Sequence, residues 1–594
     1  MTQHIRRSQF VTTYGPGAIL EGPTGPRVIP SPEIGLFVDG SRLRPNDYEI
    51  SDQRMSQGLL GGARIFRLPS NAEVGASSRQ ALYGTKPFPS WKLCLNSGGH
   101  PNTTYVLYAG GACPVCRSTW RRGIEAIRFI AACPDGHMDD VDWHYFVHRG
   151  SSCQQTEWFR WFGGGGAISN IFLECPRCGL RSVSLGQAYG QSWTCSARRP
   201  ENEPLSSRPT RLGFRCRRSS RIVQRQASNL RIPELRTLFS IPPRYTTLHN
   251  LLQAGPIYEN ILGSAPESKE QLERIIRNLA SRGRIGQASV DEILRYTWTE
   301  ISRATSDVLA DVPKTYHELI VEEFRALEES SRDGAPPQRG PAPESPVIFH
   351  VDPDLVRTVH GTSTMTYRVT PILKLRTIVV QYGYRREVDT GVRANVVPVS
   401  FTDRLNPDQK WYPGAEFLGE GVFVTAVQRV APAGGASTRW NAAMRRPADY
   451  PPEVFRDTIS REELSPLFVW WHTMAHLLVR SIASQAGYSA ASIRERIFLS
   501  ADARHGGVLL YATQPGSEGT MGGLIALVPH FQEILSSALE QIPTCSGDPL
   551  CAEQRFESGK YNGAACYACL LLSETSCEHR NLWLDRTLLR ESPP

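Results

Sequence analysis

Apolar residues recur at helical spacing in three stretches of the chain. Residues 269–283 carry apolar side chains at i, i+3, i+4 and i+7 and end at Gly283, a suitable C-cap. Residues 316–330 repeat the same spacing. Residues 464–487 are strongly apolar and end at Gly487. The pattern therefore predicts three helices, the first two amphipathic and the third largely buried.

Other stretches have the composition of strands and loops. Residues 377–388 and 419–427 are rich in β-branched and aromatic residues, which favours strands. Residues 330–346 contain five prolines and no periodicity, which indicates a linker or loop. Residues 1–92 are rich in Gly, Pro and Ser and contain short apolar runs. The whole predicts an α+β multidomain protein.

Changes in composition divide the chain into six segments. The predicted segments are a β- and loop-rich region (1–92), a Cys-rich domain with a basic segment (93–235), a helical region (236–330), a Pro-rich linker (331–346), a β-rich region (347–460) and a C-terminal domain with a Cys cluster (461–594).

The bulk composition points to a globular protein in a reducing compartment. The 594 residues are 40% hydrophobic and 21% charged, and no apolar run approaches the roughly 18 residues of a membrane span. The first residues lack the apolar core of a secretory signal. We therefore expect a cytoplasmic protein without a membrane association, in which the fourteen cysteines bind metal instead of forming disulfides.

Cysteine spacing indicates zinc-ribbon-like modules. Cys-x2-Cys pairs lie at 113–116, 175–178 and 566–569, and such a pair brings two thiolates to one ion from a tight turn. The spacing C-x2-C-x16-C-x20-C suggests one site made of Cys175, Cys178, Cys195 and Cys216. Buried free thiols are the alternative. Iron–sulfur ligation is a second alternative for any site of four cysteines.

Two further sites are predicted around the other pairs. At the C-terminus, Cys551, Cys566, Cys569 and Cys577 form a C-x14-C-x2-C-x7-C pattern, with Cys545 as a spare ligand. Cys113 and Cys116 are assigned Cys94 as third ligand, while the fourth stays open. We expect two or three Zn²⁺ ions in closed, structural sites, because four sulfur ligands leave no position for a reacting water.

Two histidine-containing motifs are candidates for catalysis. His137, Asp139, Asp140 and His144 lie close together in the sequence, as in a metal-dependent nuclease. The favoured alternative is a turn that enters a helix, with acidic residues at its N-terminus. The motif HTMAH (472–476) places two histidines one helical turn apart, but Thr473 stands where a zincin has Glu, which favours core histidines.

Positive charge is concentrated in one segment. Residues 198–236 contain eleven arginines and three glutamates, and guanidinium groups pair with phosphates. The arginines predicted to bind DNA are Arg215, Arg217, Arg218, Arg221 and Arg225. A solvated basic loop or a protein-docking surface is the alternative. No Walker A sequence occurs, so nucleotide hydrolysis by this chain alone is not expected.

Several motifs together resemble the DrmB family of the bacterial DISARM anti-phage system. The motifs run in order from residue 6 to residue 586: RRSQFVTTYGPGAIL, RFIAACPDGHMDDVDWHYFVH, QRQASNLRIPELRTLFSIPP, GEGVF, HTMAHLLV, GYSAASIRERIF, GSEGTMGGL and GAACYACLLLSETSCE. From about Phe468 onward the chain also resembles the C-terminal zinc-binding domain of MrfA-like DNA helicases.

The resemblance implies a non-catalytic, zinc-binding subunit of a defence complex. Its partner would be a SNF2-like DrmA helicase, which carries the ATP site, while this chain supports contact with DNA. The family tends to have a Cys-x2-Cys pair at Cys94, whereas this chain has Ser97 in the second position. The resemblance therefore leaves His100 or Cys133 as replacements, or the loss of that site.

Overall fold

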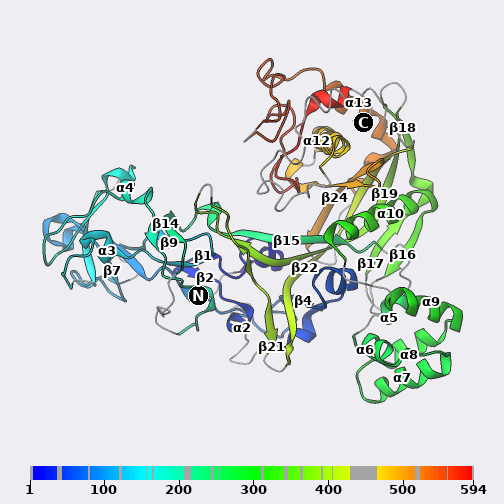
Figure 1. The fold of residues 1–594 in the computed structure, drawn as a ribbon, viewed down its shortest axis with the longest axis horizontal. Coiled ribbons are helices and arrows are strands. Elements are labelled where there is room, and N and C mark those ends of the chain that lie inside the picture. The colour runs from blue at the N-terminus through cyan, green and yellow to red at the C-terminus, as the bar shows by residue number, and fades with distance from the viewer. Residues whose placement is uncertain are drawn as a thin grey trace. The chain divides into compact units, whose positions relative to one another are not determined.

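The chain folds into two compact units that share the sequence in an interleaved way (Figure 1). The computed structural model describes residues 4–36, 43–77, 80–119, 123–154, 157–163, 166–206, 216–241, 247–252, 255–309, 314–339, 346–361, 365–389, 392–403, 406–427, 464–487, 489–515, 522–557 and 560–590. Unit 1 comprises Met1–Ile50, Ala63–Arg236 and Val379–Ala415, and unit 2 comprises Ser51–Gly62, Thr237–Ile378 and Glu416–Pro594. The boundaries at 378 and 415 fall within two long strands, β19 (Thr366–Arg385) and β22 (Asn406–Ala426).

Unit 1 is built from small antiparallel sheets. One sheet has the order β12-β11-β7-β6-β8, another β10-β9-β14-β13 and a third β1-β2-β5. The strands of the first are β6 (Trp91–Cys94), β7 (Tyr105–Ala109), β8 (Ile124–Ala126), β11 (Trp158–Phe162) and β12 (Phe172–Glu174). Those of the second are β9 (Phe129–Ala132), β10 (Met138–Asp140), β13 (Trp193–Thr194) and β14 (Ser219–Gln224). Those of the third are β1 (Ile19–Gly22), β2 (Gly25–Val28) and β5 (Lys86–Pro87).

The helices of unit 1 are short. They include α1 (Arg7–Thr12), α3 (Trp143–His148) and α4 (Leu185–Tyr189). Trp143 and Phe146 of α3 are buried against Phe159 of β11, in the largest hydrophobic cluster of this unit. The remaining apolar clusters of unit 1 contain only a few residues each. Loops between short strands therefore make up much of this unit.

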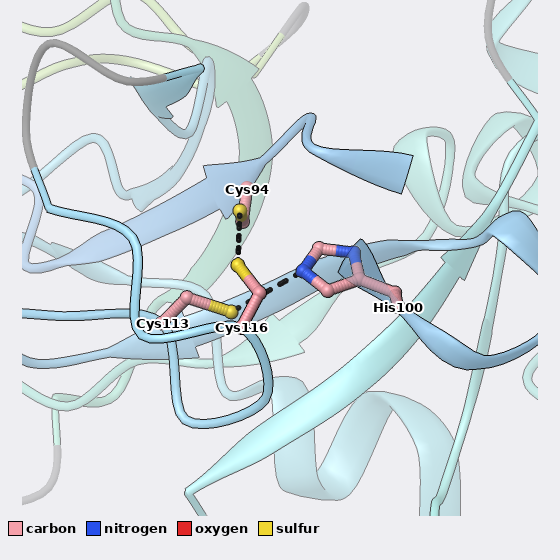
Figure 2. A group of neighbouring side chains, drawn as sticks. All are labelled: Cys94, His100, Cys113 and Cys116. Atoms are coloured by element: carbon pink, nitrogen blue, oxygen red, sulfur yellow. Dashed lines mark hydrogen bonds between the residues drawn. The ribbon is translucent and has the colours of Figure 1, made fainter. Parts of the chain in front are cut away.

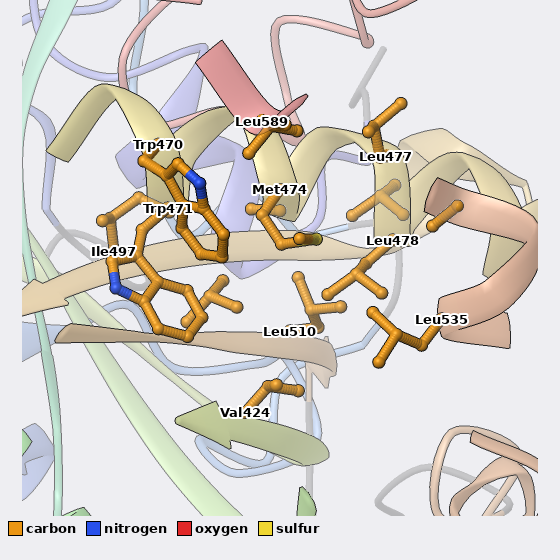
Figure 3. Close-up of a cluster of buried hydrophobic side chains, with 14 of the residues drawn as sticks. Val424, Trp470, Trp471, Met474, Leu477, Leu478, Ile497, Leu510, Leu535 and Leu589 are labelled. Atoms are coloured by element: carbon orange, nitrogen blue, oxygen red, sulfur yellow. The ribbon is translucent and has the colours of Figure 1, made fainter. Parts of the chain in front are cut away.

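Unit 2 contains a long buried helix on a sheet. Helix α12 (Pro466–Ala486) packs on β23 (Arg494–Leu499) and β24 (Gly506–Pro515), and α13 (Phe531–Glu540) packs beside it. Figure 3 shows Met474, Leu477 and Leu478 of α12 above the strands. Gly506 is required at its position, because a Cβ there would lie 2.7 Å from the Trp471 ring. This apolar cluster is the largest in the described residues.

In the rest of unit 2, a series of helices between Thr247 and Asp333 is followed by strands. Helices α5 (Thr247–Leu252), α6 (Gly255–Ser264), α7 (Lys269–Ser281), α8 (Gln287–Leu294) and α9 (Trp298–Leu309) share one apolar cluster. Helix α10 (Tyr316–Asp333) follows, and its first turn is closed by a capping box. Strands β16 (Ala335–Arg339) and β17 (Val347–Val351) pair with each other, and β17 pairs with β19.

The helices and strands expected from periodicity are confirmed. Helices α7, α10 and α12 occupy the predicted stretches, and Gly283 and Gly487 have left-handed φ values of 68°. Strand β19 includes residues 377–385 of the first predicted β-rich stretch, and β22 includes residues 419–426 of the second. In the expected linker, Ala335–Arg339 instead forms β16, because residues such as Pro336 and Pro337 fit the edge strand of a sheet. None of the described helices is long and apolar enough to span a bilayer.

Candidate metal centres

Donor side chains in unit 1 gather into three groups of four. Within each group the ligand atoms lie within 4.8 Å of one another. We name them the Cys94 group (Cys94, His100, Cys113, Cys116), the Cys133 group (Cys133, His137, Cys195, Cys216) and the Cys175 group (His148, Cys153, Cys175, Cys178). Every cysteine in them is a free thiol, so disulfides do not explain the clustering.

The Cys94 group is held by a strand and a loop. Cys94 ends β6, and Cys113 and Cys116 lie in the loop between β7 and β8 (Figure 2). The Cys94 and Cys116 sulfurs are 3.6 Å apart, and His100 Nε2 lies 3.4 Å from Cys113 Sγ. His100 therefore occupies the position that the sequence left open, and Ser97 is not part of the group.

The His100 ring is oriented for metal binding. Its Nδ1–H donates to the carbonyl oxygen of Thr104 at 2.7 Å, which leaves the lone pair on Nε2 facing the thiols. Such a backbone partner fixes the tautomer of metal-binding histidines. Burial raises the pKa of the Cys116 thiol, but hydrogen bonds with Ser118, His100 and Cys94 together outweigh it and lower the pKa to about 6. A thiolate, the form that binds zinc, is thereby favoured.

The Cys133 group lies at one end of the sheet that contains β9, β10, β13 and β14. Cys133 and His137 flank the turn between β9 and β10, and the turn requires Gly136, whose φ is 81°. Cys195 follows β13 and Cys216 precedes β14, so antiparallel pairing of neighbouring strands brings all four residues together. The Cys195 thiol and the His137 ring lower the pKa of Cys133 to about 4, although burial opposes them.

The Cys175 group joins helix α3 to the turn after β12. The sulfurs of Cys153 and Cys175 are 3.7 Å apart. The His148 Nδ1–H donates to the His144 carbonyl oxygen at 3.0 Å, while its Nε2 is buried and has no hydrogen-bond partner among the described residues. This lone pair is available to an ion held by the three cysteines. Backbone N–H groups of Arg177 and Cys178 donate to Cys175 Sγ, as in a metal-binding turn.

Unit 2 contains an all-sulfur group near its C-terminus. We name Cys545, Cys551, Cys566 and Cys569 the Cys545 group. The sulfurs of Cys545 and Cys566 are 3.4 Å apart, and those of Cys551 and Cys569 are 3.7 Å apart. The Cys551 sulfur is buried, and burial raises the pKa of its thiol.

The donor distances in the four groups match tetrahedral zinc. Zinc bonds of about 2.0–2.1 Å to nitrogen and 2.3 Å to sulfur give edges of about 3.3–3.8 Å between ligands. The contacts described above, from 3.4 to 3.7 Å, fall in this range. So do the 3.3 Å contact of Cys133 Sγ with His137 Nδ1 and the 3.8 Å contact of Cys566 Sγ with Cys569 Sγ. The Cys and His clusters thus have the composition and geometry of Zn²⁺ sites.

Two groupings expected from spacing differ from the groups that the structure brings together. Cys175 and Cys178 do not share a group with Cys195 and Cys216. The first pair lies with His148 and Cys153, at and after the end of α3. The second lies with Cys133 and His137, at the turn after β9. At the C-terminus Cys545 replaces Cys577 in the group of four cysteines. Cys577 Sγ lies instead 3.2 Å from His472 Nε2. The cysteine spacing did not identify His148 and Cys153, whereas Cys545, predicted as a spare ligand, is a member of its group.

The motif considered for a nuclease does not form one acidic cluster. His137 belongs to the Cys133 group, and Asp142 accepts a hydrogen bond from the Tyr145 N–H as the N-cap of α3. Asp139 and Asp140 lie 2.6 and 3.6 Å from the Arg198 guanidinium. His144 Nε2 donates to the Cys153 carbonyl oxygen at 2.7 Å. The capping role that the sequence predicts is confirmed.

The arginines predicted to bind DNA have different surroundings. Arg221 pairs with Asp389 at 2.9 Å, and Arg225 pairs with Glu21 at 2.7 Å. Arg217 is exposed. The Arg218 side chain is 46% exposed, and its Nε lies 3.7 Å from Asp135 Oδ1. Arg215 lies outside the described residues.

Comparisons with known proteins agree with this arrangement. Residues 6–232 match a family described as a domain of unknown function, DUF8724, and include all three groups of unit 1. Residues 474–570 match the MrfA Zn-binding domain and include the Cys545 group. A protein of Bacillus paralicheniformis, "DISARM protein DrmB", is 24% identical over 536 residues, covering 85% of this chain and 88% of the relative.

A solved structure, the DUF1998 helicase MrfA bound to DNA, is 11% identical and covers 34% of this chain. The match spans only 22% of the helicase and has a TM-score of 0.18, below the level at which folds correspond. The curated relative and the zinc-binding domain confirm the resemblance of this chain to DrmB of DISARM, with a C-terminal domain similar to that of MrfA.

Proposed function

We propose that this chain is a non-catalytic, zinc-binding subunit of a DISARM-type anti-phage system. It would associate with a SNF2-like DrmA helicase and help to hold DNA, while the helicase hydrolyses ATP. The observation that carries the proposal is the combination of four closed Cys/His groups with similarity to DrmB over 85% of the chain.

The proposed zinc ligands are the sixteen members of the four groups. Each group offers four donors, so a bound ion would have no open position for a reacting water. Zinc in such a site stabilises loops and does not activate a nucleophile. The non-catalytic role follows from this ligand set and from the lack of a Walker A sequence.

The proposed DNA surface is centred on Arg217 and Arg218. Both follow Cys216 directly, so an ion in the Cys133 group would fix their backbone. Exposed guanidinium groups on a fixed backbone can contact phosphates with little loss of entropy. Arg221 and Arg225 stay predicted contacts, but their ion pairs with Asp389 and Glu21 would have to be shared or broken.

The test is co-purification of the full chain with a SNF2-like DrmA helicase, followed by DNA titration of the complex at several salt concentrations. We expect a stable complex, and failure of the two proteins to associate would contradict the proposal. Replacing Arg217 and Arg218 with alanine should lower DNA affinity and reduce the salt slope by about 1.8, since each phosphate contact contributes about 0.9.

The matched control is Arg295→Ala. Arg295 is also an exposed arginine, with a 75% exposed side chain that pairs with Glu292 at 2.8 Å, but it caps the C-terminus of helix α8 in unit 2. Its replacement should leave both affinity and salt slope unchanged. Equal losses in the control and in the Arg217/Arg218 variant would show that the proposed surface has no special role.

A further inference from the structure

Unit 2 holds a fifth group of donors that differs from the other four. His472 and His476 lie one turn apart on α12, Glu495 is the second residue of β23, and Cys577 comes from the C-terminal segment. Their ligand atoms lie within 4.8 Å of one another, and we name them the Glu495 group. The two histidines and the glutamate are fully buried, and Cys577 is 5% exposed.

The side chains converge on one point. Glu495 Oε1 lies 2.9 Å from His472 Nε2 and 3.0 Å from His476 Nε2. Cys577 Sγ lies 3.2 Å from His472 Nε2. The second oxygen of the carboxylate, Oε2, is buried and has no hydrogen-bond partner among the described residues. A buried carboxylate with an unused oxygen costs free energy unless a cation is near.

The position of the hydrogen on the His476 ring indicates such a cation. Its Nδ1 lies 2.9 Å from the Leu570 carbonyl oxygen, which can only accept, so Nδ1 carries the hydrogen. In the neutral ring Nε2 then has a lone pair, and it faces a carboxylate oxygen that also only accepts. Two acceptors 3.0 Å apart repel each other unless a positive charge lies between or beside them.

The same ring orientation occurs in the cysteine groups. His100 and His148 also donate Nδ1–H to a backbone carbonyl oxygen and present Nε2 to their groups. In the Glu495 group the backbone supports the thiolate as well, because the N–H groups of His579 and Asn581 each lie 3.3 Å from Cys577 Sγ. This support of ligands by backbone groups is typical of metal sites.

Protonation of both histidines is a poorer way to supply the charge. Their ring centroids are only 4.7 Å apart, and both rings are fully buried. Two imidazolium ions this close would repel each other and would share a single carboxylate. One divalent ion neutralises the carboxylate and the thiolate and accepts the lone pairs of both rings at once.

We propose that His472, His476, Glu495 and Cys577 bind a zinc ion in a mixed nitrogen, oxygen and sulfur site. Imidazole and thiolate ligands favour zinc over magnesium or calcium, and a single thiolate is too few for an iron–sulfur cluster. The four protein ligands close the site, so the ion is structural. It fastens the C-terminal segment to α12 and β23, independently of the Cys545 group.

The site is tested by the metal content of the purified full chain, measured by inductively coupled plasma mass spectrometry. Cys577→Ser and His476→Ala should each lose one zinc equivalent relative to the unmodified chain. A double variant, Cys577→Ser with Cys566→Ser, should lose two equivalents, because the two sites are separate. Full zinc content in folded Cys577→Ser and His476→Ala would overturn the proposal.

The control is His505→Gln. His505 is a buried histidine 2.7 Å from Glu328, but it lies in none of the five groups. Its replacement should leave the zinc content unchanged. Loss of one equivalent in this control too would show that the assay reports general destabilisation, and would remove the support from the Cys577 result.

A second measurement needs no substitution. Anomalous scattering at the zinc edge from crystals of the unmodified chain should give a peak enclosed by these four side chains. Peaks at the other four groups without one here would overturn the proposal. A peak here that appears at the iron edge would overturn the assignment to zinc.

Discussion

The two units place their donor groups in different structural settings. In unit 1 three groups lie between residues 94 and 216, where strands are short and the largest apolar cluster, around Trp143 and Phe159, is smaller than that of unit 2. In unit 2 the groups lie beside the large core of α12, β23 and β24. Small regions cannot bury enough apolar surface to offset the entropy of folding, and metal ions replace the missing core. Zinc should therefore hold unit 1 together, but should secure only one segment of unit 2.

The largest expected effect is that of zinc removal. A structural zinc site contributes on the order of 10 kcal/mol to folding, so a strong chelator should unfold residues 94–224. The core strand β24 and helix α12 should stay folded, since their apolar contacts remain. Hydrogen exchange followed by mass spectrometry distinguishes the two regions. Equal loss of protection in α12 and in β9 would contradict the difference between the units.

A substitution in the apolar core of unit 2 should destabilise unit 2 and leave unit 1 intact. Leu478 of α12 is fully buried in the large cluster, and truncation of such a leucine costs about 2–5 kcal/mol. Leu478→Ala should lower the denaturant midpoint of unit 2 and leave the zinc content of the chain unchanged.

The control for this change is Leu550→Ala. Leu550 is 78% exposed, and replacement of an exposed leucine should alter stability by no more than about 0.5 kcal/mol. If Leu478→Ala released zinc from the groups of unit 1, the two units would not be energetically separate.

The same difference explains what the sequence could predict. Helix α12 follows from its own apolar pattern, as do α7 and α10, because helices depend mainly on local spacing. The Cys-x2-Cys pairs were also found locally. Cys94 and Cys551 lie with the pairs to which the spacing assigned them. The other partners do not follow from spacing, because strand pairing decides which loops meet: β9, β13 and β14 bring Cys133 to Cys195 and Cys216. A one-dimensional spacing contains no information about that pairing.

The Glu495 group shows most clearly what the sequence does not predict. His472 and His476 lie in a strongly apolar helix, a pattern that predicts core histidines. They are buried, but they also face Glu495, whose approach depends on β23 lying against α12. A carboxylate 19 residues away from His476 gives no sequence signal of its own.

The smallest expected effect concerns two helix caps. Asp142 Oδ1 accepts from the Tyr145 N–H at the start of α3, and Ser465 Oγ accepts from the Phe468 N–H at the start of α12. Loss of an N-cap costs about 1 kcal/mol in either helix. Asp142→Ala should also speed zinc loss to a chelator, because the six-residue α3 carries His148 at its end.

Ser465→Ala should not affect the rate of zinc loss, since the large core holds α12 in place. Asp142→Asn is the matched variant that retains a capping oxygen, and it should behave like the unmodified chain. The rate of zinc release to a chromogenic chelator measures all three. Equal acceleration in Ser465→Ala and Asp142→Ala would mean that α12 depends on its donor groups as much as α3 does. That result would contradict the claim that unit 1 depends on zinc more than unit 2.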